Sequence, residues 1–343
     1  MSLTQASRIL GVFVALLLAP DTLAAPICSG GTVIKNSGGT IVGCKFTTWT
    51  SSEISQCSGA TILSTTRNGF CYVCLVEPYA AQVQSGNWSG LTPNDFTCLG
   101  CVNSPGGNVG WWSFDENFGT SFDLSPGSPN YNDRFADFYN GGTFLPGKVQ
   151  GEAQLDGVND YVEVLDHPDL NFGAAGPNGA GNFSFEGWIR LSSLVNYQTT
   201  MSLVDKRLSS PVRGYHIALY YQKLLLQLAD GTSYNFVAPT VVPANDTWYH
   251  VAITVDRLST TGVAFYLNGA LQGTANPTAR SGSLATIHAL RFGTRSPNLG
   301  GGAYFNGRID ELSLYNRVLT QSEIQAIFNA DRYGKCKPYA KWW

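Results

Sequence analysis

Short runs with an apolar residue at every second position dominate the chain after residue 108. In residues 183–191, Phe183, Phe185, Ile189 and Leu191 fall on one face, and that period of two is the period of a β-strand. Similar runs lie at residues 215–221, 224–228, 248–255, 263–267, 288–292 and 308–315. Turn signals such as Asn268-Gly269 separate them. The pattern predicts an all-β chain with an antiparallel β-sandwich or jelly roll.

One helix is predicted near the C-terminus. Thr320 and Glu323 have the spacing of a capping box, in which each side chain caps the other residue's backbone N–H. Ile324, Ile327 and Phe328 follow as an apolar stripe, so we expect one short helix packed against the sandwich.

Composition narrows the classes of protein that fit. Charged residues make up 13% of the 343 residues, about half the usual share of roughly 25%, which argues against a helical bundle or coiled coil. The formal net charge of −3 leaves no broad basic surface, so no nucleic-acid partner is expected. A hydrophobic share of 43% argues against disorder.

The first 25 residues have the pattern of a secretory signal peptide. Arg8 precedes an apolar run at residues 9–19, and small residues follow up to a cleavage site near Ala24–Pro26. The run is shorter than the roughly 20 residues that a membrane span needs. No later segment is long and apolar enough to span a membrane. We therefore expect a secreted, extracellular protein without a membrane span.

Seven of the eight cysteines lie before residue 102, and the eighth is Cys336. An even number in an exported chain favours disulfides, in which case Cys336 must reach back toward the N-terminal region. Two Cys-x-x-Cys pairs are also spaced to hold zinc through four thiolates, and their members are Cys71, Cys74, Cys98 and Cys101. Zinc and disulfides both remain open at these four positions.

These signals divide the chain into a signal peptide (1–25), a cysteine-rich β module (26–104), the sandwich (105–338) and a tail (339–343). The module has short strand-like runs at 32–34 and 40–42, and its low apolar content calls for covalent or metal cross-links. A turn-rich stretch at 103–107 marks the boundary with the sandwich.

Six phrases of the sandwich region together resemble one family. They are Val109–Asp115, Gly147–Glu163, Phe183–Trp188, Thr247–Asp256, Phe265–Gly269 and Phe305–Thr320. Their order and spacing resemble a LamG-like jelly-roll domain of the concanavalin A-like lectin/glucanase superfamily, over residues 109–336. The resemblance implies two antiparallel sheets packed face to face, with a short helix near the C-terminus. The ending at residues 334–338 is similar to that of bacterial secreted members.

Asp310 is the most informative carboxylate, because strict alternation places it on the same face as Leu312 and Leu314. A carboxylate on a core face needs a partner. Calcium would supply one, and the resemblance implies that such modules often carry a structural calcium. The candidate ligands are Asp115, Asp123, Asp156 and Asp310. The alternative is that Asp310 accepts backbone N–H groups or pairs with an arginine.

Glu186 and Trp188 alternate with the core residues of their strand, so an exposed tryptophan beside a carboxylate could bind a sugar. The alternative is that this second face is buried as well. Further residues that could line a binding edge are Tyr197, Tyr220, Tyr221, Tyr304 and Arg295.

The sequence lacks recognisable catalytic motifs. The Glu-x-Asp-x-x-Glu carboxylate pattern of glucanases with this sandwich fold is absent, as are the Gly-x-Ser-x-Gly and His-Glu-x-x-His motifs. We therefore assign no catalytic residue and predict a secreted binding protein for a carbohydrate or an extracellular protein. The alternatives are an extracellular glycan-active enzyme and a structural component of a surface or matrix.

Overall fold

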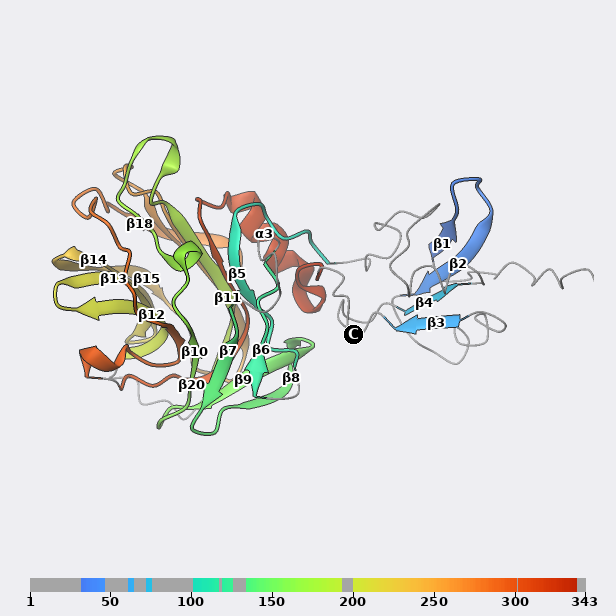
Figure 1. The fold of residues 1–343 in the computed structure, drawn as a ribbon, viewed down its shortest axis with the longest axis horizontal. Helices are drawn as coiled ribbons and strands as arrows, with labels where there is room; N and C mark the ends of the chain where they lie inside the picture. The colour runs from blue at the N-terminus through green and yellow to red at the C-terminus, as the bar shows by residue number, and fades with distance from the viewer. Residues whose placement is uncertain are drawn as a thin grey trace, which may run out of the picture. The chain divides into compact units, whose positions relative to one another are not determined.

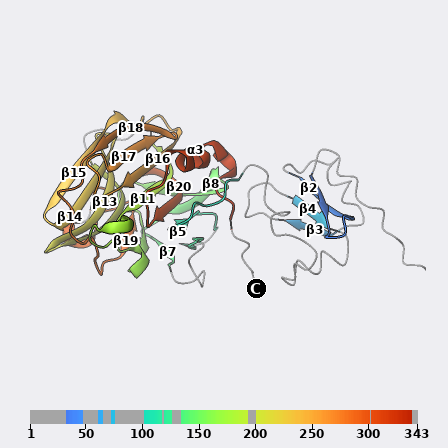
Figure 2. The same ribbon diagram turned by 90° about the horizontal axis from the view of Figure 1, so that it is seen from above.

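The structure is a computed structural model that describes residues 32–46, 61–64, 72–75, 101–116, 119–125, 134–192, 200–300 and 302–337. The predicted signal peptide lies outside these residues. The chain divides into two units, one of residues 1–63 with 73–92 and one of residues 64–72 with 93–343. Figures 1 and 2 together label the strands of both units and the helix α3.

The smaller sheet belongs to the N-terminal region and has the strand order β1-β2-β4-β3. Its strands are β1 (Thr32–Lys35), β2 (Ile41–Phe46), β3 (Thr61–Ser64) and β4 (Tyr72–Leu75). The Asn36 side chain shapes the turn between β1 and β2, because its Oδ1 accepts the N–H groups of Gly38 and Thr40. Cys44 of β2 is buried and disulfide-bonded.

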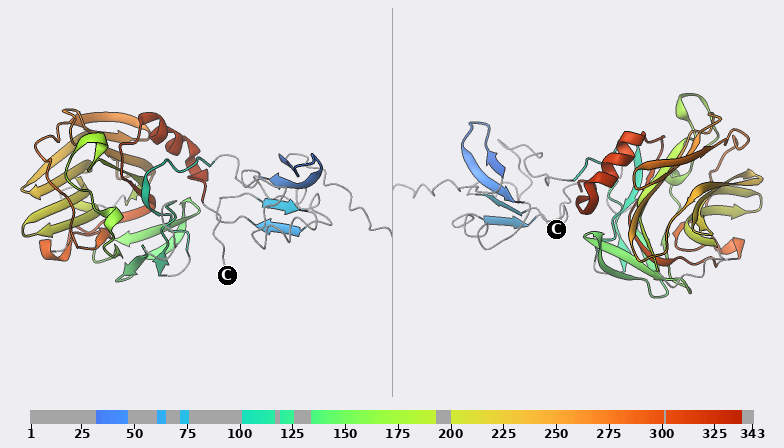
Figure 3. Two further views of the ribbon diagram at one scale, coloured as in Figure 1. Left: turned by 45° about the horizontal axis from the view of Figure 1, so that its top comes forward. Right: turned by 180° about the vertical axis from the view of Figure 1, so that it is seen from behind.

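The second unit is a sandwich of two antiparallel sheets (Figures 1 and 3). The first, here called the β13 sheet, has the order β15-β14-β13-β12-β19-β10-β7-β6. Its strands are β6 (Thr120–Ser121), β7 (Ala136–Tyr139), β10 (Tyr161–Val164), β12 (Thr200–Ser209), β13 (Val212–Tyr220), β14 (Lys223–Gly231), β15 (Ser233–Val241) and β19 (Leu290–Phe292).

The second sheet, here called the β11 sheet, has the order β18-β17-β16-β11-β20-β9-β8, and β5 also pairs with β20. Its strands are β5 (Asn108–Trp112), β8 (Thr143–Val149), β9 (Gly151–Asp156), β11 (Phe183–Leu191), β16 (Trp248–Val255), β17 (Val263–Leu267), β18 (Ala270–Ala275) and β20 (Asn306–Tyr315). The predicted antiparallel sandwich is confirmed.

The core lies between the two sheets. Alternate residues of β11 enter it from one side, and alternate residues of β13 enter it from the other, so that Phe183 and Tyr215 meet with ring centroids 5.4 Å apart. Phe172 stacks on Phe183 at 4.5 Å and closes one end of the same cluster. The period-two pattern in the sequence therefore marks the inner faces of both sheets.

Helix α3 (Gln321–Ala330) confirms the predicted C-terminal helix, and it lies outside the sandwich against the β11 sheet (Figures 2 and 3). Glu323 N–H donates to Thr320 Oγ1 at 3.2 Å, and Thr320 N–H donates to Glu323 Oε2 at 2.8 Å. Ile324 and Ile327 are buried, and the Phe328 ring contacts that of Trp188. Among the residues that the structure describes, no helix has the length and apolar character to span a membrane.

A disulfide between Cys101 and Cys336 joins the two ends of the sandwich region. Beside it, Val102 N–H donates to the Gly334 carbonyl at 2.9 Å, and Cys336 N–H donates to the Val102 carbonyl at 2.8 Å. Cys336 thus reaches back as the all-disulfide alternative requires. Because the Cys101 sulfur is bonded to Cys336, it is not available as a zinc thiolate.

The other three proposed zinc ligands are not placed by the structure. Cys71 and Cys98 lie outside the described residues, as does the side chain of Cys74. Zinc at those positions stays a prediction.

Removing the disulfide should destabilise the sandwich. It links cysteines 235 positions apart, so the cross-link restricts the unfolded chain strongly. We expect the double variant Cys101→Ser/Cys336→Ser to lose about 2–5 kcal/mol of unfolding free energy, measured by urea denaturation. An unchanged urea midpoint would show that the hydrogen bonds of Val102 suffice to hold the two ends.

Candidate functional site

Glu186 and Trp188 lie on the outer face of β11, but neither reaches solvent. Their relative exposures are 0% and 2%, because α3 and the residues after it fold over this face. The Trp188 ring lies 5.9 Å from that of Phe328 and 5.2 Å from that of His250. The prediction that Glu186 and Trp188 form an exposed sugar-binding pair is therefore wrong, and the alternative of a second buried face holds.

Glu186 is the centre of a buried ionic network. Its Oε1 accepts from Lys335 Nζ at 2.7 Å and from Tyr315 Oη at 3.0 Å, and its Oε2 accepts from His250 Nε2 at 3.1 Å. Burial alone would raise the pKa of Glu186, but the charge of Lys335 and the hydrogen bond from His250 lower it to about 2. Glu186 is thus held ionised as the counterion of a buried lysine.

Asp310 lies opposite Trp188 on the same outer face, not beside Leu312 and Leu314. The register between β20 and β11 shifts here, and Glu311 takes the left-handed backbone conformation with φ 57°. This bulge adds one residue, so that Ile309 and Leu312 both enter the core although they are three apart. The strict alternation assumed from the sequence was wrong at this point.

The carboxylate of Asp310 is satisfied in part by backbone. Its Oδ2 accepts the Val149 N–H at 2.8 Å, which is the arrangement foreseen as the alternative to a metal ion. Burial and the neighbouring Glu311 carboxylate raise the pKa of Asp310 well above its usual range.

The other three predicted calcium ligands also have partners of their own. Asp123 pairs with Arg134 Nε at 2.6 Å, Asp115 pairs with Lys337, and Asp156 accepts the Val158 N–H at 2.7 Å. Within the described ranges, no three or more His, Cys, Asp or Glu side chains are grouped so as to hold a metal ion. Calcium binding stays an untested prediction.

The outer face of the β13 sheet is different, because one row of polar residues crosses all eight of its strands in register. This polar row consists of Asn235, Gln227, His216, Asp205, Arg291, Glu163, Asp137 and Thr120. The adjacent register row, with Leu226, Ile217, Val204, Phe292 and Val162, is buried in the core. Successive side chains point to opposite faces, so the polar row faces away from the core.

Side-chain hydrogen bonds link the central part of the row. Gln227 Nε2 donates to Asn235 Oδ1 at 2.6 Å, and Arg207 donates to both Gln227 and Asp205. His216 Nε2 lies 2.9 Å from Ser202 Oγ. Further along, Arg291 Nε donates to Glu163 Oε2 at 2.7 Å, and Thr120 Oγ1 donates to Asp137 Oδ1 at 2.8 Å. These links fix planar amide, guanidinium and carboxylate groups in defined positions.

A cavity of about 250 Å³ opens over this part of the sheet, and we call it the sheet pocket. Its lining residues are Thr200, Arg207, His216, Tyr220, Leu225, Gln227, Asn235, Val237 and Arg295. Arg207 and His216 are buried, whereas Tyr220 is 41% exposed and packs edge-on against Tyr221. Tyr220 and Arg295, named from the sequence as candidates for a binding edge, therefore lie at one site. Tyr304 does not line it, and Tyr197 is not described.

The imidazole in the sheet pocket is neutral. Burial lowers the pKa of His216 well below its usual range, and the charges of Arg207 and Arg295 act in the same direction. The pocket thus combines a neutral hydrogen-bonding ring with two guanidinium groups.

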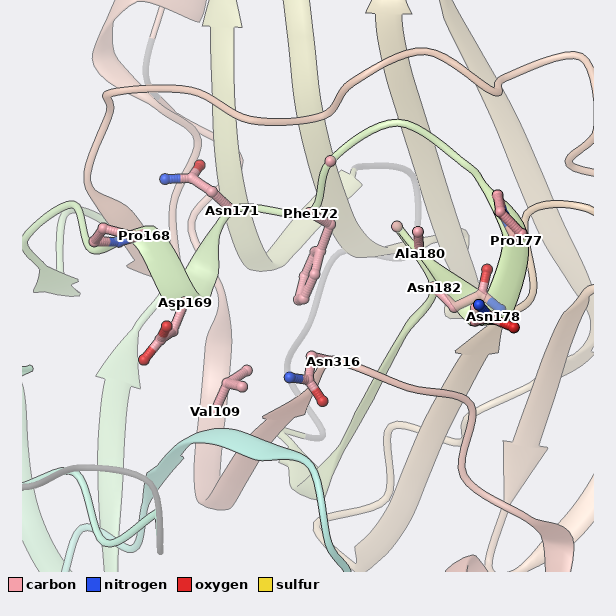
Figure 4. A pocket seen from close by; sticks show the side chains of 13 residues that line it. Val109, Pro168, Asp169, Asn171, Phe172, Pro177, Asn178, Ala180, Asn182 and Asn316 are labelled. Carbon is pink, nitrogen blue, oxygen red and sulfur yellow. The ribbon is translucent and has the colours of Figure 1, made fainter.

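A second hollow, the loop pocket, measures about 510 Å³ and lies among the loops at one end of the sandwich (Figure 4). Phe172 points between one group of residues around Asn171 and another around Asn182. Both asparagines already support loops: Asn171 Oδ1 accepts the Thr286 N–H, and Asn182 binds Asp256 and the Arg257 N–H. We therefore regard the sheet pocket as the stronger candidate site.

Comparison with known proteins agrees with this fold. Residues 156–325 match the model of the family described as the concanavalin A-like lectin/glucanases superfamily. No curated protein matches the chain.

Among solved structures, the binding domain of Paraclostridial Mosquitocidal Protein 1 is similar, with a TM-score of 0.51 and 18% identity. The match covers 65% of this chain and 52% of that one, so the chain spans about half of its length. Domain 4 of an extracellular arabinanase from Geobacillus stearothermophilus, solved with arabinotriose, has a TM-score of 0.46 and 19% identity over 64% of this chain and 96% of that one. At 18% identity the likeness to the mosquitocidal binding domain concerns the fold alone.

Replacing Glu186 by Gln should destabilise the protein strongly. The variant leaves the buried Lys335 ammonium with only the more distant Glu311 carboxylate, 3.4 Å away, as its partner. Removing one member of a buried ion pair costs about 3–5 kcal/mol. Urea denaturation of Glu186→Gln should show this loss, whereas Asp246→Asn, which breaks the surface pair with Arg190, should have a much smaller effect. Equal effects of the two variants would contradict the central role of Glu186.

Glu311 should make stability depend on pH. Burial raises the pKa of Glu311 from 4.5 to about 7, with Lys335 opposing the rise and the Glu186 charge adding to it. The folded state therefore binds more protons than the unfolded state between about pH 4.5 and 7, so the unfolding free energy falls as pH rises through this window. We expect Glu311→Gln to flatten that fall in denaturation curves.

Glu323→Gln is the matched control for this measurement. The pKa of Glu323 is lowered to about 2 by Arg317 and Thr320, so its contribution is lost only below about pH 4.5. Parallel profiles for the wild type and Glu311→Gln between pH 4.5 and 7 would contradict the raised pKa of Glu311.

Proposed function

We propose that this protein is a secreted carbohydrate-binding protein and that the polar row with its sheet pocket is the binding surface. The observation that carries the proposal is the register of the row, which brings polar side chains from eight strands into one line. At about 4.8 Å between strands, such a row extends for roughly 30 Å. That length suits a linear glycan better than a single small molecule.

The chemistry of the surface supports this proposal. Sugars offer hydroxyl groups that both donate and accept hydrogen bonds, and they present apolar C–H faces to aromatic rings. The row supplies amide, imidazole, guanidinium and carboxylate groups held by one another, and Tyr220 supplies an exposed ring at the rim. Preorganised polar side chains reduce the entropy that ligand binding costs.

Export is supported by the signal-like residues 1–25 and by the Cys101–Cys336 disulfide, which suits an oxidising compartment. The β11 sheet supports the choice of surface, because α3 covers the outer face at Trp188. The β13 sheet is therefore the one that offers a polar outer face to a ligand.

A glycan array probed with the full-length protein tests the proposal. We expect binding to a subset of glycans, and we expect Gln227→Ala and Tyr220→Ala each to weaken it by about fivefold to thirtyfold, through loss of a hydrogen bond or an aromatic contact of roughly 1–2 kcal/mol. Gln325→Ala on the exposed side of α3 is the matched control and should leave binding unchanged.

Absence of binding to every glycan, or full binding by Gln227→Ala and Tyr220→Ala, would overturn the assignment. Reducing-sugar release from a bound polysaccharide would instead indicate an enzyme, and self-association without any ligand would indicate a matrix component.

A further inference from the structure

We propose that the sheet pocket recognises the carboxylate of an acidic sugar unit, with Arg295 as the residue that binds it. This inference rests on the proposed carbohydrate function and specifies the class of glycan. Positive charge is in excess at the pocket, because two arginines line it and only one of them has a carboxylate partner.

Two guanidinium groups line the pocket, and they differ in their partners. The charge of Arg207 is compensated by Asp205, whose two carboxylate oxygens share its Nε–H at 3.0 and 3.1 Å and whose Oδ2 also accepts from its Nη2. Asp205 is itself fully buried and is held further by Ser296 Oγ at 3.1 Å. Arg207 is therefore a fixed hydrogen-bond donor whose charge is already compensated.

Arg295 has no such compensation. Among the residues that the structure describes, no carboxylate lies within ion-pair distance of it, and its guanidinium donates no hydrogen bond. None of the nine residues that line the pocket is acidic. A half-buried cation that faces a cavity without a counterion is stabilised by an anionic ligand, because charge-assisted hydrogen bonds are among the strongest available.

The backbone around Arg295 is anchored, so its side chain starts from a fixed point beside the pocket. Arg295 N–H donates to the Gly302 carbonyl at 3.2 Å, and Thr294 Oγ1 donates to the same carbonyl at 3.1 Å. The short 3-10 helix η4 (Pro297–Leu299) follows directly, and Phe305 N–H donates to the Gly293 carbonyl at 2.9 Å. Such anchoring lowers the entropy lost when an anion is bound.

The pocket has room for one sugar unit. Its volume of about 250 Å³ lies below the roughly 300–1,000 Å³ of typical drug-sized sites. The neutral His216 ring and the Gln227 amide supply uncharged donors and acceptors for hydroxyl groups beside the anion. Beyond the buried Asp205, the polar row continues with the half-buried Arg291 and Glu163, which offer polar groups to a further part of a glycan chain.

The decisive experiment compares glycans that differ only in charge. Isothermal titration calorimetry would measure binding of oligogalacturonides, of their fully methyl-esterified forms, of sialyllactose against lactose, and of a sulfated but carboxylate-free oligosaccharide. We expect at least one carboxylate-bearing glycan to bind about tenfold to a hundredfold more tightly than its neutral counterpart. The preference should shrink as salt is raised.

Variants link that preference to Arg295. Arg295→Gln should abolish the preference for the acidic glycan and leave binding of the neutral one in place, whereas Arg295→Lys should retain part of it. Arg332→Gln, which removes an exposed charge beside Tyr333, is the control for net charge and should retain the preference. Unchanged thermal melting of each variant would show that folding is intact.

Each outcome decides between the two proposals. Equal binding of acidic and neutral glycans, a preference that survives Arg295→Gln, or binding of the sulfated probe alone would overturn the carboxylate assignment while leaving carbohydrate binding intact. No binding to any probe, acidic or neutral, would overturn both.

Discussion

The buried ion pair between Lys335 and Glu186 is the interaction on which the layout of the sandwich depends. It holds the C-terminal segment against the middle of the β11 sheet, where the Cys101–Cys336 disulfide adds a covalent tie. A buried charge is costly without a partner, so neither side chain can leave this position alone. Since the segment and α3 cover the outer face there, the proposed ligand surface lies on the other sheet.

In the β13 sheet, successive side chains point to opposite faces, and the two faces differ in character: one is apolar and the other polar. Inward residues such as Ile217 and Leu226 join the core, and their outward neighbours His216 and Gln227 belong to the polar row. Because hydrogen-bonded strands keep their register, a polar residue on one strand lies beside the polar residue at the paired position of the next strand, and together they form the polar row. A polar surface of this kind needs no long loop to assemble it.

Much of the fold followed from local patterns. The strand period marked the core residues of β11, and the pair Thr320 and Glu323 marked the start of α3. Both features depend on neighbouring residues along the chain and so appear in the sequence. The candidate site was predicted only in part, because the sequence analysis named Tyr220 and Arg295 but not Gln227 or His216. The strands of Gln227 and His216 were predicted correctly. Nothing in the sequence marked these two residues as part of a site, because their alignment arises from pairing between strands.

The errors have two physical causes. Glu311 adds one residue to β20 and so moves Asp310 to the opposite face, and a single left-handed residue leaves little trace in a hydrophobic pattern. The sequence allowed either an exposed or a buried face at Trp188, because it does not reveal which face a distant helix will cover. By itself, the sequence determined the strands, the helix and the sandwich class, since these depend on the period of apolar residues and on local capping. Only the tertiary structure decided which sheet face is open to solvent and which charges are compensated. Both depend on contacts between residues far apart in the chain, such as Glu186 with Lys335 and Asp205 with Ser296.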